Sequence, residues 1–167
     1  MVKCVSILGS TGSIGRQTLD VVSRLPGVRV GALTAGKSVD RMEAQCRTFL
    51  PELAVMATQE AARALADRIP DLPIRVAYGE AGLMEAAALE STDCVITAVV
   101  GMVGLKPTLA AIRAGKRIGL ANKETLWSAP ENWLWRRRKS TEAKSFPWTR
   151  SIPPSFSALW AVLTAGK

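Results

Sequence analysis

The sequence predicts an α/β fold: a doubly wound, mainly parallel sheet with helices on both faces, followed by an irregular C-terminal tail. The first observation is that short apolar segments typical of strands alternate with amphipathic helical repeats from about residue 3 to residue 121. The second is the run Asp93–Val100 (DCVITAVV), whose continuous apolar character is typical of a strand buried on both faces. A chain of 167 residues is long enough for one such domain and hardly long enough for two.

The expected elements follow one another at short intervals. Lys3–Leu8 is the first predicted strand, and after a glycine-rich turn apolar side chains recur at helical spacing until Pro26-Gly27 ends the helix. Further strands are expected at 28–35, 53–57, 74–77, 93–100 and 117–121, with helices at 39–50, 58–69, 80–89 and about 105–114. Thr58 is expected to cap the helix that it begins. The alternation predicts that the carboxyl ends of the strands meet at one edge of the sheet.

The overall composition is that of a folded protein without a membrane span. Hydrophobic residues make up 48% of the chain and charged residues 22%. No stretch is long and apolar enough to cross a membrane, and the start of the chain does not resemble a signal peptide. Three cysteines form neither a disulfide framework nor a metal-binding spacing, and Cys4 and Cys94 are expected to be buried. We therefore expect a cytoplasmic protein.

The composition changes abruptly near Leu126. All five tryptophans lie beyond this residue, whereas 12 of the 13 glycines lie before it. Residues 127–167 hold 7 of the 22 lysines and arginines but only 2 of the 14 acidic residues, so they supply most of the net charge of +8. We therefore divide the chain into a domain at 1–126 and a basic tail with tryptophans and prolines at 127–167, which we expect to be poorly ordered.

A glycine-rich turn, Gly9–Gly15 (GSTGSIG), joins the first strand to the first helix. Its three glycines allow a sharp turn, close approach of a ligand and close packing of helix against strand, a pattern typical of a Rossmann-like nucleotide site. The helix N-terminus offers backbone N–H groups to a pyrophosphate. We expect the hydroxyls of Ser10, Thr11 and Ser13 to add donors. Because glycine-rich turns also occur without a ligand, the turn alone leaves both interpretations open.

A second polar turn, Gly36-Lys37-Ser38, follows the second predicted strand. An acidic residue here would accept a hydrogen bond from the 2′-hydroxyl of NAD and repel the 2′-phosphate of NADP. No acid occurs before Asp40, while Lys37 can pair with a phosphate and Ser38 can donate to it. If a dinucleotide binds, we expect NADP; otherwise Lys37 is an ordinary exposed lysine.

The last predicted strand brings a polar triplet, Asn122-Lys123-Glu124, to the same edge of the sheet. Such a triplet is often no more than a solvated loop. An amide, a cation and a carboxylate can instead orient a nicotinamide ribose and an anionic substrate. Together with the loop Gly101–Gly104, the polar turns converge on one edge, which favours a binding site over unrelated loops.

Four segments together resemble those of one enzyme family: Gly9–Gly15, Ala35–Ser38 (AGKS), Thr97–Leu105 (TAVVGMVGL) and Ala121–Leu126 (ANKETL). From about residue 3 to residue 126 the chain is similar to 1-deoxy-D-xylulose-5-phosphate reductoisomerase. The resemblance implies an enzyme of non-mevalonate isoprenoid synthesis that depends on NADPH and a divalent metal, Mg or Mn. It would rearrange the carbon skeleton of its substrate and reduce the aldehyde to 2-C-methyl-D-erythritol 4-phosphate.

The resemblance also implies roles for individual residues. Four would hold the pyrophosphate of NADPH: Thr11, Gly12, Ser13 and Ile14. Three would take the side of its 2′-phosphate: Gly36, Lys37 and Ser38. Asn122 and Glu124 would contact the nicotinamide half, and Lys123 would face the sugar-phosphate substrate. The family forms a homodimer, an arrangement that we do not expect this chain to preserve.

Beyond Leu126 the chain departs from the family, which continues with a helix and a metal-binding segment, Val-Asp-Ser-Glu-His-Ser. The tail reads instead WSAPENWLWRRRK from Trp127 onward, and the whole chain contains no histidine. Synonymous codons can be chosen for residues 126–157 and translated in the frame that begins at the third base of each codon. This shifted frame then encodes both the family's helix and its metal-binding segment, in that order. We therefore hypothesise that residues from about 127 onward arise from a one-base frameshift, which the DNA sequence can decide.

The altered tail affects the expected activity. Glu131 and Glu142 do not stand in the family's metal-binding pattern, so we expect this chain to bind NADPH at best and not to turn over substrate by itself. A different NADP reductase with the same glycine turn is an alternative that the triplet Asn122–Glu124 disfavours. Another alternative is a basic protein whose arginines and tryptophans contact nucleic acid, although we expect no sequence-specific binding.

Overall fold

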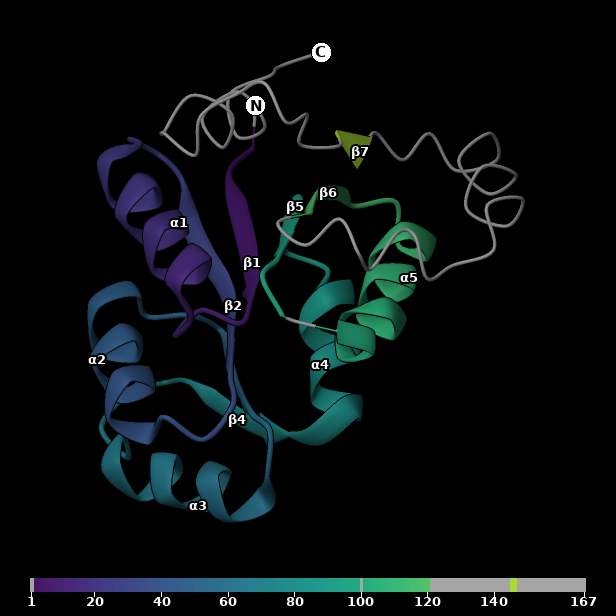
Figure 1. The fold of residues 1–167 in the computed structure, drawn as a ribbon. Helices are drawn as coiled ribbons and strands as arrows, with labels where there is room; N and C mark the ends of the chain where they lie inside the picture. Colours follow the sequence, from purple (N-terminus) through teal and green to yellow (C-terminus); the bar gives the residue numbers. More distant parts are fainter. Residues whose placement is uncertain (1, 100, 121–144, 147–167) are drawn as a thin grey trace.

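The computed structural model describes residues 2–99, 101–120 and 145–146. Seven parallel strands within these ranges form one sheet in the order β4-β3-β2-β1-β5-β6-β7 (Figure 1). The strands are β1 Cys4–Leu8, β2 Arg29–Ala35, β3 Leu53–Met56, β4 Arg75–Tyr78, β5 Cys94–Thr97, β6 Arg117–Leu120 and β7 Ser145–Phe146. The helices are α1 Ser13–Arg24, α2 Val39–Phe49, α3 Gln59–Arg68, α4 Gly79–Ala88 and α5 Leu105–Arg113, with a 3₁₀ helix at Gly101–Gly104.

The predicted α/β fold and the order of its elements through β6 are confirmed. Most element ends agree with the sequence prediction to within a residue or two, and Thr58 caps α3 as expected, since its side chain accepts a hydrogen bond from the Ala61 N–H at 3.3 Å. The strand expected at 93–100 is shorter: Ala98 still donates to the Leu8 carbonyl at 2.8 Å, but the chain then leaves the sheet. The segment Gly101–Gly104, expected as a loop, is a 3₁₀ turn.

Strand β7 is an addition that the sequence did not predict. Ser145 pairs with Ile118 and Phe146 with Gly119, so β7 extends the sheet beyond β6. Two residues are too few to show a hydrophobic period, and the tail was expected to be irregular. The rest of the predicted tail domain, 127–167, lies outside the described residues.

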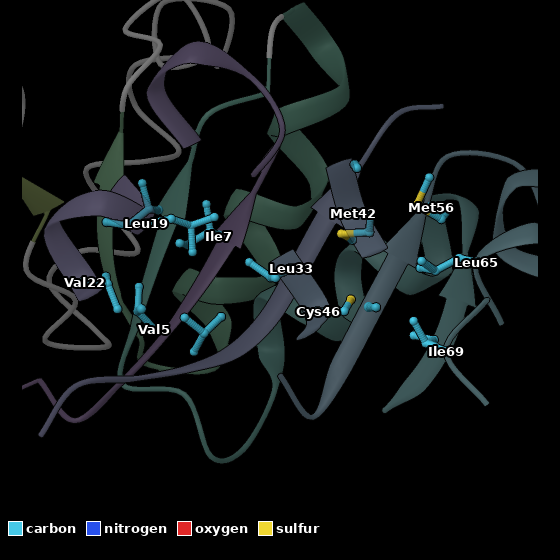
Figure 2. Close-up of a cluster of buried hydrophobic side chains, with 14 of the residues drawn as sticks. Val5, Ile7, Leu19, Val22, Leu33, Met42, Cys46, Met56, Leu65 and Ile69 are labelled. Carbon is cyan, nitrogen blue, oxygen red and sulfur yellow. The ribbon is translucent and has the colours of Figure 1, made fainter. Parts of the chain in front are cut away.

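Helices cover both faces of the sheet. Helices α1, α2 and α3 pack on one face through a cluster that includes Leu19, Met42 and Leu65, and α4 and α5 pack on the other with Ala86, Ala87 and Ala111 (Figure 1). Figure 2 shows the larger cluster, in which strand residues such as Ile7 and Leu33 meet side chains from α1 and α2. These strand and helix side chains are almost completely buried.

The order of the strands reverses beside β1. The chain runs outward from β1 to β4, and α4 then returns across the opposite face, packing against β1, β2 and β3, to place β5 on the other side of β1. The return is close, because a Cβ on Gly82 would lie 2.7 Å from Cγ1 of Val55. In open parallel sheets ligands bind at the carboxyl ends of the strands where the order reverses. A ligand is therefore expected beside the turns that follow β1 and β5.

The burial expected for Cys4 and Cys94 is confirmed. Cys4, Cys46 and Cys94 are free and buried. Burial raises the pKa of Cys46 to about 11 and that of Cys94 to about 12. Among the helices of the described ranges, none has the length and apolar character needed to cross a bilayer.

Candidate functional site

The turn after β1 begins with a glycine that the fold itself requires. Gly9 has a φ of +87°, a conformation that favours glycine. A Cβ at this position would lie 2.9 Å from the carbonyl oxygen of Ala98, which follows β5. Gly9 therefore allows β1 to turn sharply while it remains beside β5.

Gly15, in the first turn of α1, is also required by packing. A Cβ on this residue would lie 2.2 Å from the Gly9 carbonyl oxygen and 2.5 Å from Cα of Ser10. Both atoms belong to the backbone of the turn, so neither could move without displacing it. Gly15 thus allows α1 to begin directly against the turn.

Gly12 differs from the other two glycines. Its φ of −73° and ψ of 173° are accessible to any residue, and among the described residues a Cβ would approach only the Gly9 carbonyl oxygen, at 3.4 Å. Gly12 is exposed and occupies the N-cap position of α1. Because the fold does not require a glycine here, its absent side chain leaves room for a ligand to approach the helix N-terminus.

The N-terminus of α1 suits an anion. No side chain of the described residues caps it, and its first turn contains no acidic residue, whereas Thr58 caps α3. The first backbone N–H groups of a helix have no partner within it and carry a partial positive charge. Thr11 is half-buried, and Ser13 and Ile14 are exposed at this end. The predicted pyrophosphate residues therefore surround an open helix terminus.

The expectation that Ser10 donates to a ligand is wrong. Ser10 is fully buried, and its hydroxyl proton has two acceptors, Oε1 of Gln45 at 2.6 Å and the Thr34 carbonyl at 3.1 Å. The side chain faces inward because α2 packs against this side of the turn. Gln45 is thus a residue of the site that sequence reasoning missed, and its separation from the turn by 35 residues gave no local signal.

The second predicted turn lies at the end of β2, next to the glycine turn. Gly36, Lys37 and Ser38 are all exposed. A Cβ on Gly36 would meet nothing within 4 Å among the described residues. Ser38 occupies the N-cap position of α2 without a side-chain capping bond in that part of the chain. The structure thus brings together two of the three predicted polar segments.

The first acid after this turn is engaged elsewhere. Asp40 forms an ion pair and hydrogen bond with Arg68 at the end of α3, and this hydrogen bond raises the pKa of the Arg68 guanidinium above its usual value. The negative charge of Asp40 is therefore partly balanced by Arg68, and this reduces its repulsion of an anion at the turn. This arrangement is compatible with a phosphate beside Lys37.

The third polar segment, Asn122-Lys123-Glu124, lies outside the described residues, so its position relative to the turns stays a prediction. At the end of β5, the buried Oγ1 of Thr97 has no hydrogen-bond partner within the described ranges. Those ranges also contain no cluster of three or more His, Cys, Asp or Glu side chains that could hold a metal ion. The divalent metal of the resemblance therefore has no ligand set there.

The sheet order, the glycine turn and the open N-terminus of α1 define the class: this is a Rossmann-like α/β domain. Residues 5–130 match the family model for 1-deoxy-D-xylulose 5-phosphate reductoisomerase. The chain therefore belongs to the 1-deoxy-D-xylulose 5-phosphate reductoisomerase family.

Curated relatives and solved structures agree with this assignment. The chain is 55% identical over 132 residues to the reductoisomerase of Heliobacterium modesticaldum, a match covering 77% of this chain and 34% of the relative. It is 50% identical over 140 residues to that of Moorella thermoacetica, covering 83% and 36%. The Zymomonas mobilis enzyme, solved in complex with NADPH, superposes with a TM-score of 0.81 at 35% identity, covering 88% and 38%. The chain thus spans about a third of the length of these relatives.

Another solved reductoisomerase, in complex with NADPH, fosmidomycin and magnesium, gives a TM-score of 0.81 at 37% identity and covers 87% of this chain and 36% of that one. The solved structures share the Rossmann-like α/β fold of this chain. They lend no support to the alternative of a nucleic-acid-binding protein.

Proposed function

We propose that this chain binds NADPH as the N-terminal, cofactor-binding part of a 1-deoxy-D-xylulose 5-phosphate reductoisomerase. The observation that carries the proposal is the uncapped N-terminus of α1 behind Gly12, placed where the strand order reverses. A glycine that the fold does not need, in front of free helix N–H groups, fits a pyrophosphate that must approach the backbone closely.

The two described turns would hold different parts of the dinucleotide. The pyrophosphate would lie against Thr11, Gly12, Ser13 and Ile14. Its adenosine 2′-phosphate would lie against Gly36, Lys37 and Ser38, where Lys37 supplies a positive charge and Ser38 a hydroxyl donor. The solved relatives that contain NADPH support the choice of NADP over NAD.

The remaining roles concern the reacting end of the cofactor. Asn122 and Glu124 would contact the nicotinamide half, and Lys123 would hold the sugar-phosphate substrate. NADPH, when bound, would supply the hydride for the reduction that completes the family's reaction. Because residues 2–99 and 101–120 offer no metal-binding cluster, we assign the metal-dependent rearrangement to the complete family enzyme.

We also infer that the chain works in the cytoplasm. Its three cysteines are free and buried, and such thiols are typical of a reducing compartment.

Isothermal titration calorimetry with NADPH at physiological salt tests the proposal. Saturable binding is expected, and Gly12→Asp should weaken it by about tenfold or more, because the new carboxylate would stand in front of the helix terminus and repel the pyrophosphate. Ala66→Asp is the matched control, since Ala66 is exposed on α3 and the substitution adds the same charge far from the turn. Equal affinities for the two variants would contradict the proposed site, and salt-sensitive oligonucleotide binding without NADPH binding would favour the nucleic-acid alternative.

A further inference from the structure

Gln45 and Ser10 form a reciprocal pair of hydrogen bonds between α2 and the glycine turn. Gln45 donates from Nε2 to the Ser10 carbonyl at 3.0 Å and accepts from the Ser10 hydroxyl on Oε1 at 2.6 Å. Ser10 is fully buried and Gln45 is half-buried, so water competes poorly for these bonds. The oxygen and the nitrogen of the Gln45 amide thus both bind the same turn residue, Ser10.

The pair fixes the direction of a backbone donor. In a trans peptide the carbonyl and the N–H of the next residue point in opposite directions within one plane. Because Nε2 of Gln45 holds the Ser10 carbonyl toward α2, the N–H of Thr11 points away from α2. The preceding peptide is fixed as well, since the Ser10 N–H donates to the Thr34 carbonyl at 2.8 Å.

We propose that Gln45 is a positioning residue of the cofactor site, which orients the Thr11 N–H as a preformed donor to the pyrophosphate. The inference rests on the proposed function, because it needs an anion in front of α1. Gln45 itself does not touch the cofactor. It acts through the peptide between Ser10 and Thr11, and it spares the turn the cost of ordering when the ligand binds.

The two bonds of the pair make different predictions. Ser10→Ala removes the hydroxyl but leaves the bond from Nε2 to the carbonyl of residue 10, so the peptide keeps its orientation. Gln45→Met has a similar size and shape but removes both bonds and frees the peptide to rotate. The proposal therefore assigns the main effect to Gln45→Met, although Ser10 is the residue in the turn.

The test compares NADPH with 2′-AMP, a probe that lacks the pyrophosphate, on the full chain. Calorimetry should show that Gln45→Met weakens NADPH binding by about tenfold and Ser10→Ala by less than about threefold. NMR titration should show the affinity for 2′-AMP unchanged within about twofold in both variants, because that probe uses only the turn after β2. A merely structural role for Gln45 would weaken both ligands together.

Three results overturn the inference. The first is unaltered NADPH affinity in Gln45→Met, and the second is an equal loss for NADPH and 2′-AMP. The third, no NADPH binding by the unaltered chain, contradicts the proposed function itself and is separate from the other two. If Gln45→Met does not fold, Gln45→Glu keeps the acceptor for Ser10 and removes the donor, with the exposed Thr48→Glu on the same helix as the charge control. Equal NADPH affinity in these two variants again overturns the inference.

Discussion

Gly9 donates its backbone N–H to Thr34 twice over, to the side-chain Oγ1 at 2.9 Å and to the carbonyl oxygen at 3.2 Å. Thr34 is the penultimate residue of β2, and the turn Gly36–Ser38 begins two residues later. The glycine turn and the turn after β2 are therefore tied together at one residue. The distance between the proposed sites for the pyrophosphate and the 2′-phosphate is set before any ligand arrives.

Thr34→Val removes the side-chain acceptor and keeps the carbonyl. Thr34 is 1% exposed, and in the variant the Gly9 N–H keeps only its longer bond, to the Thr34 carbonyl at 3.2 Å. We expect the free energy of unfolding to fall by about 1 kcal/mol, measured by urea denaturation. Thr48→Val on the exposed face of α2 is the matched control and should change stability by less than about 0.5 kcal/mol. Similar losses in the two variants would contradict the role of Thr34.

Gly15→Ala should mainly lower the stability of the fold, whereas Gly12→Ala should mainly lower the affinity for NADPH. At Gly15 the added methyl group would meet backbone atoms at 2.2 and 2.5 Å, so we expect a loss of more than about 2 kcal/mol in urea denaturation despite the better helix propensity of alanine. At Gly12, the N-cap of α1, the methyl group meets one atom of the described residues, at 3.4 Å, and the loss of stability should stay below about 1 kcal/mol. NADPH affinity should nevertheless fall in Gly12→Ala. Unaltered NADPH affinity in Gly12→Ala would contradict the close approach of the ligand.

The fold could be predicted from sequence because its signals are local. Apolar runs such as Cys94–Thr97 and helical repeats such as that of α1 occur within a few residues of each other, and their alternation leaves few topologies open. The ends of elements depend on partners distant in sequence, and β5 ends at Thr97 although the apolar run continues to Val100. The two-residue pairing of β7 with β6 likewise has no signature in the chain.

Within the candidate site, the open backbone positions were predictable from the sequence. Gly12 and Gly36 follow from the positions of the turns, and both are found at open places on the carboxyl edge. The direction of a side chain was not predictable in the same way. Ser10 faces Gln45 instead of a ligand because α2 packs beside the turn, a contact between residues 35 positions apart.

Lys37→Ala tests which dinucleotide the turn after β2 prefers. Lys37 is exposed at the end of β2, and the proposed 2′-phosphate would be its charge partner. We expect calorimetry to show about a tenfold loss of NADPH affinity and no change for NADH, which lacks that phosphate. Lys3→Ala, at the opposite edge of the sheet, is the control and should alter neither affinity. An equal loss of affinity for NADPH and NADH would show that Lys37 does not bind the 2′-phosphate.

Cys46 should make the fold sensitive to alkaline pH. Burial raises the pKa of its thiol from 9.0 to about 11, with a smaller contribution from the charge of Glu43. Because the folded pKa lies above the unfolded value, the stabilisation is complete below pH 9 and is lost as the pH rises toward 11. Between pH 9 and 11 the unaltered chain should lose roughly 1 kcal/mol of unfolding free energy per pH unit relative to Cys46→Val. Cys94 titrates in both proteins, so parallel curves would contradict the assignment to Cys46.

The basic tail makes a prediction about the gene. The family model matches residues 5–130, and the chain beyond holds four of the five tryptophans and the run Arg136–Lys139. The family resemblance implies a metal-binding segment at this place instead. If a one-base frameshift produced the tail, codons 147–156 read from their third base must encode Asp-Ser-Glu in order, and sequencing codons 120–170 checks this. The same shifted reading of codons 5–120 is the control and should give nothing that resembles the family. A neighbouring frame without Asp-Ser-Glu contradicts the hypothesis, because synonymous choice alone then accounts for the agreement.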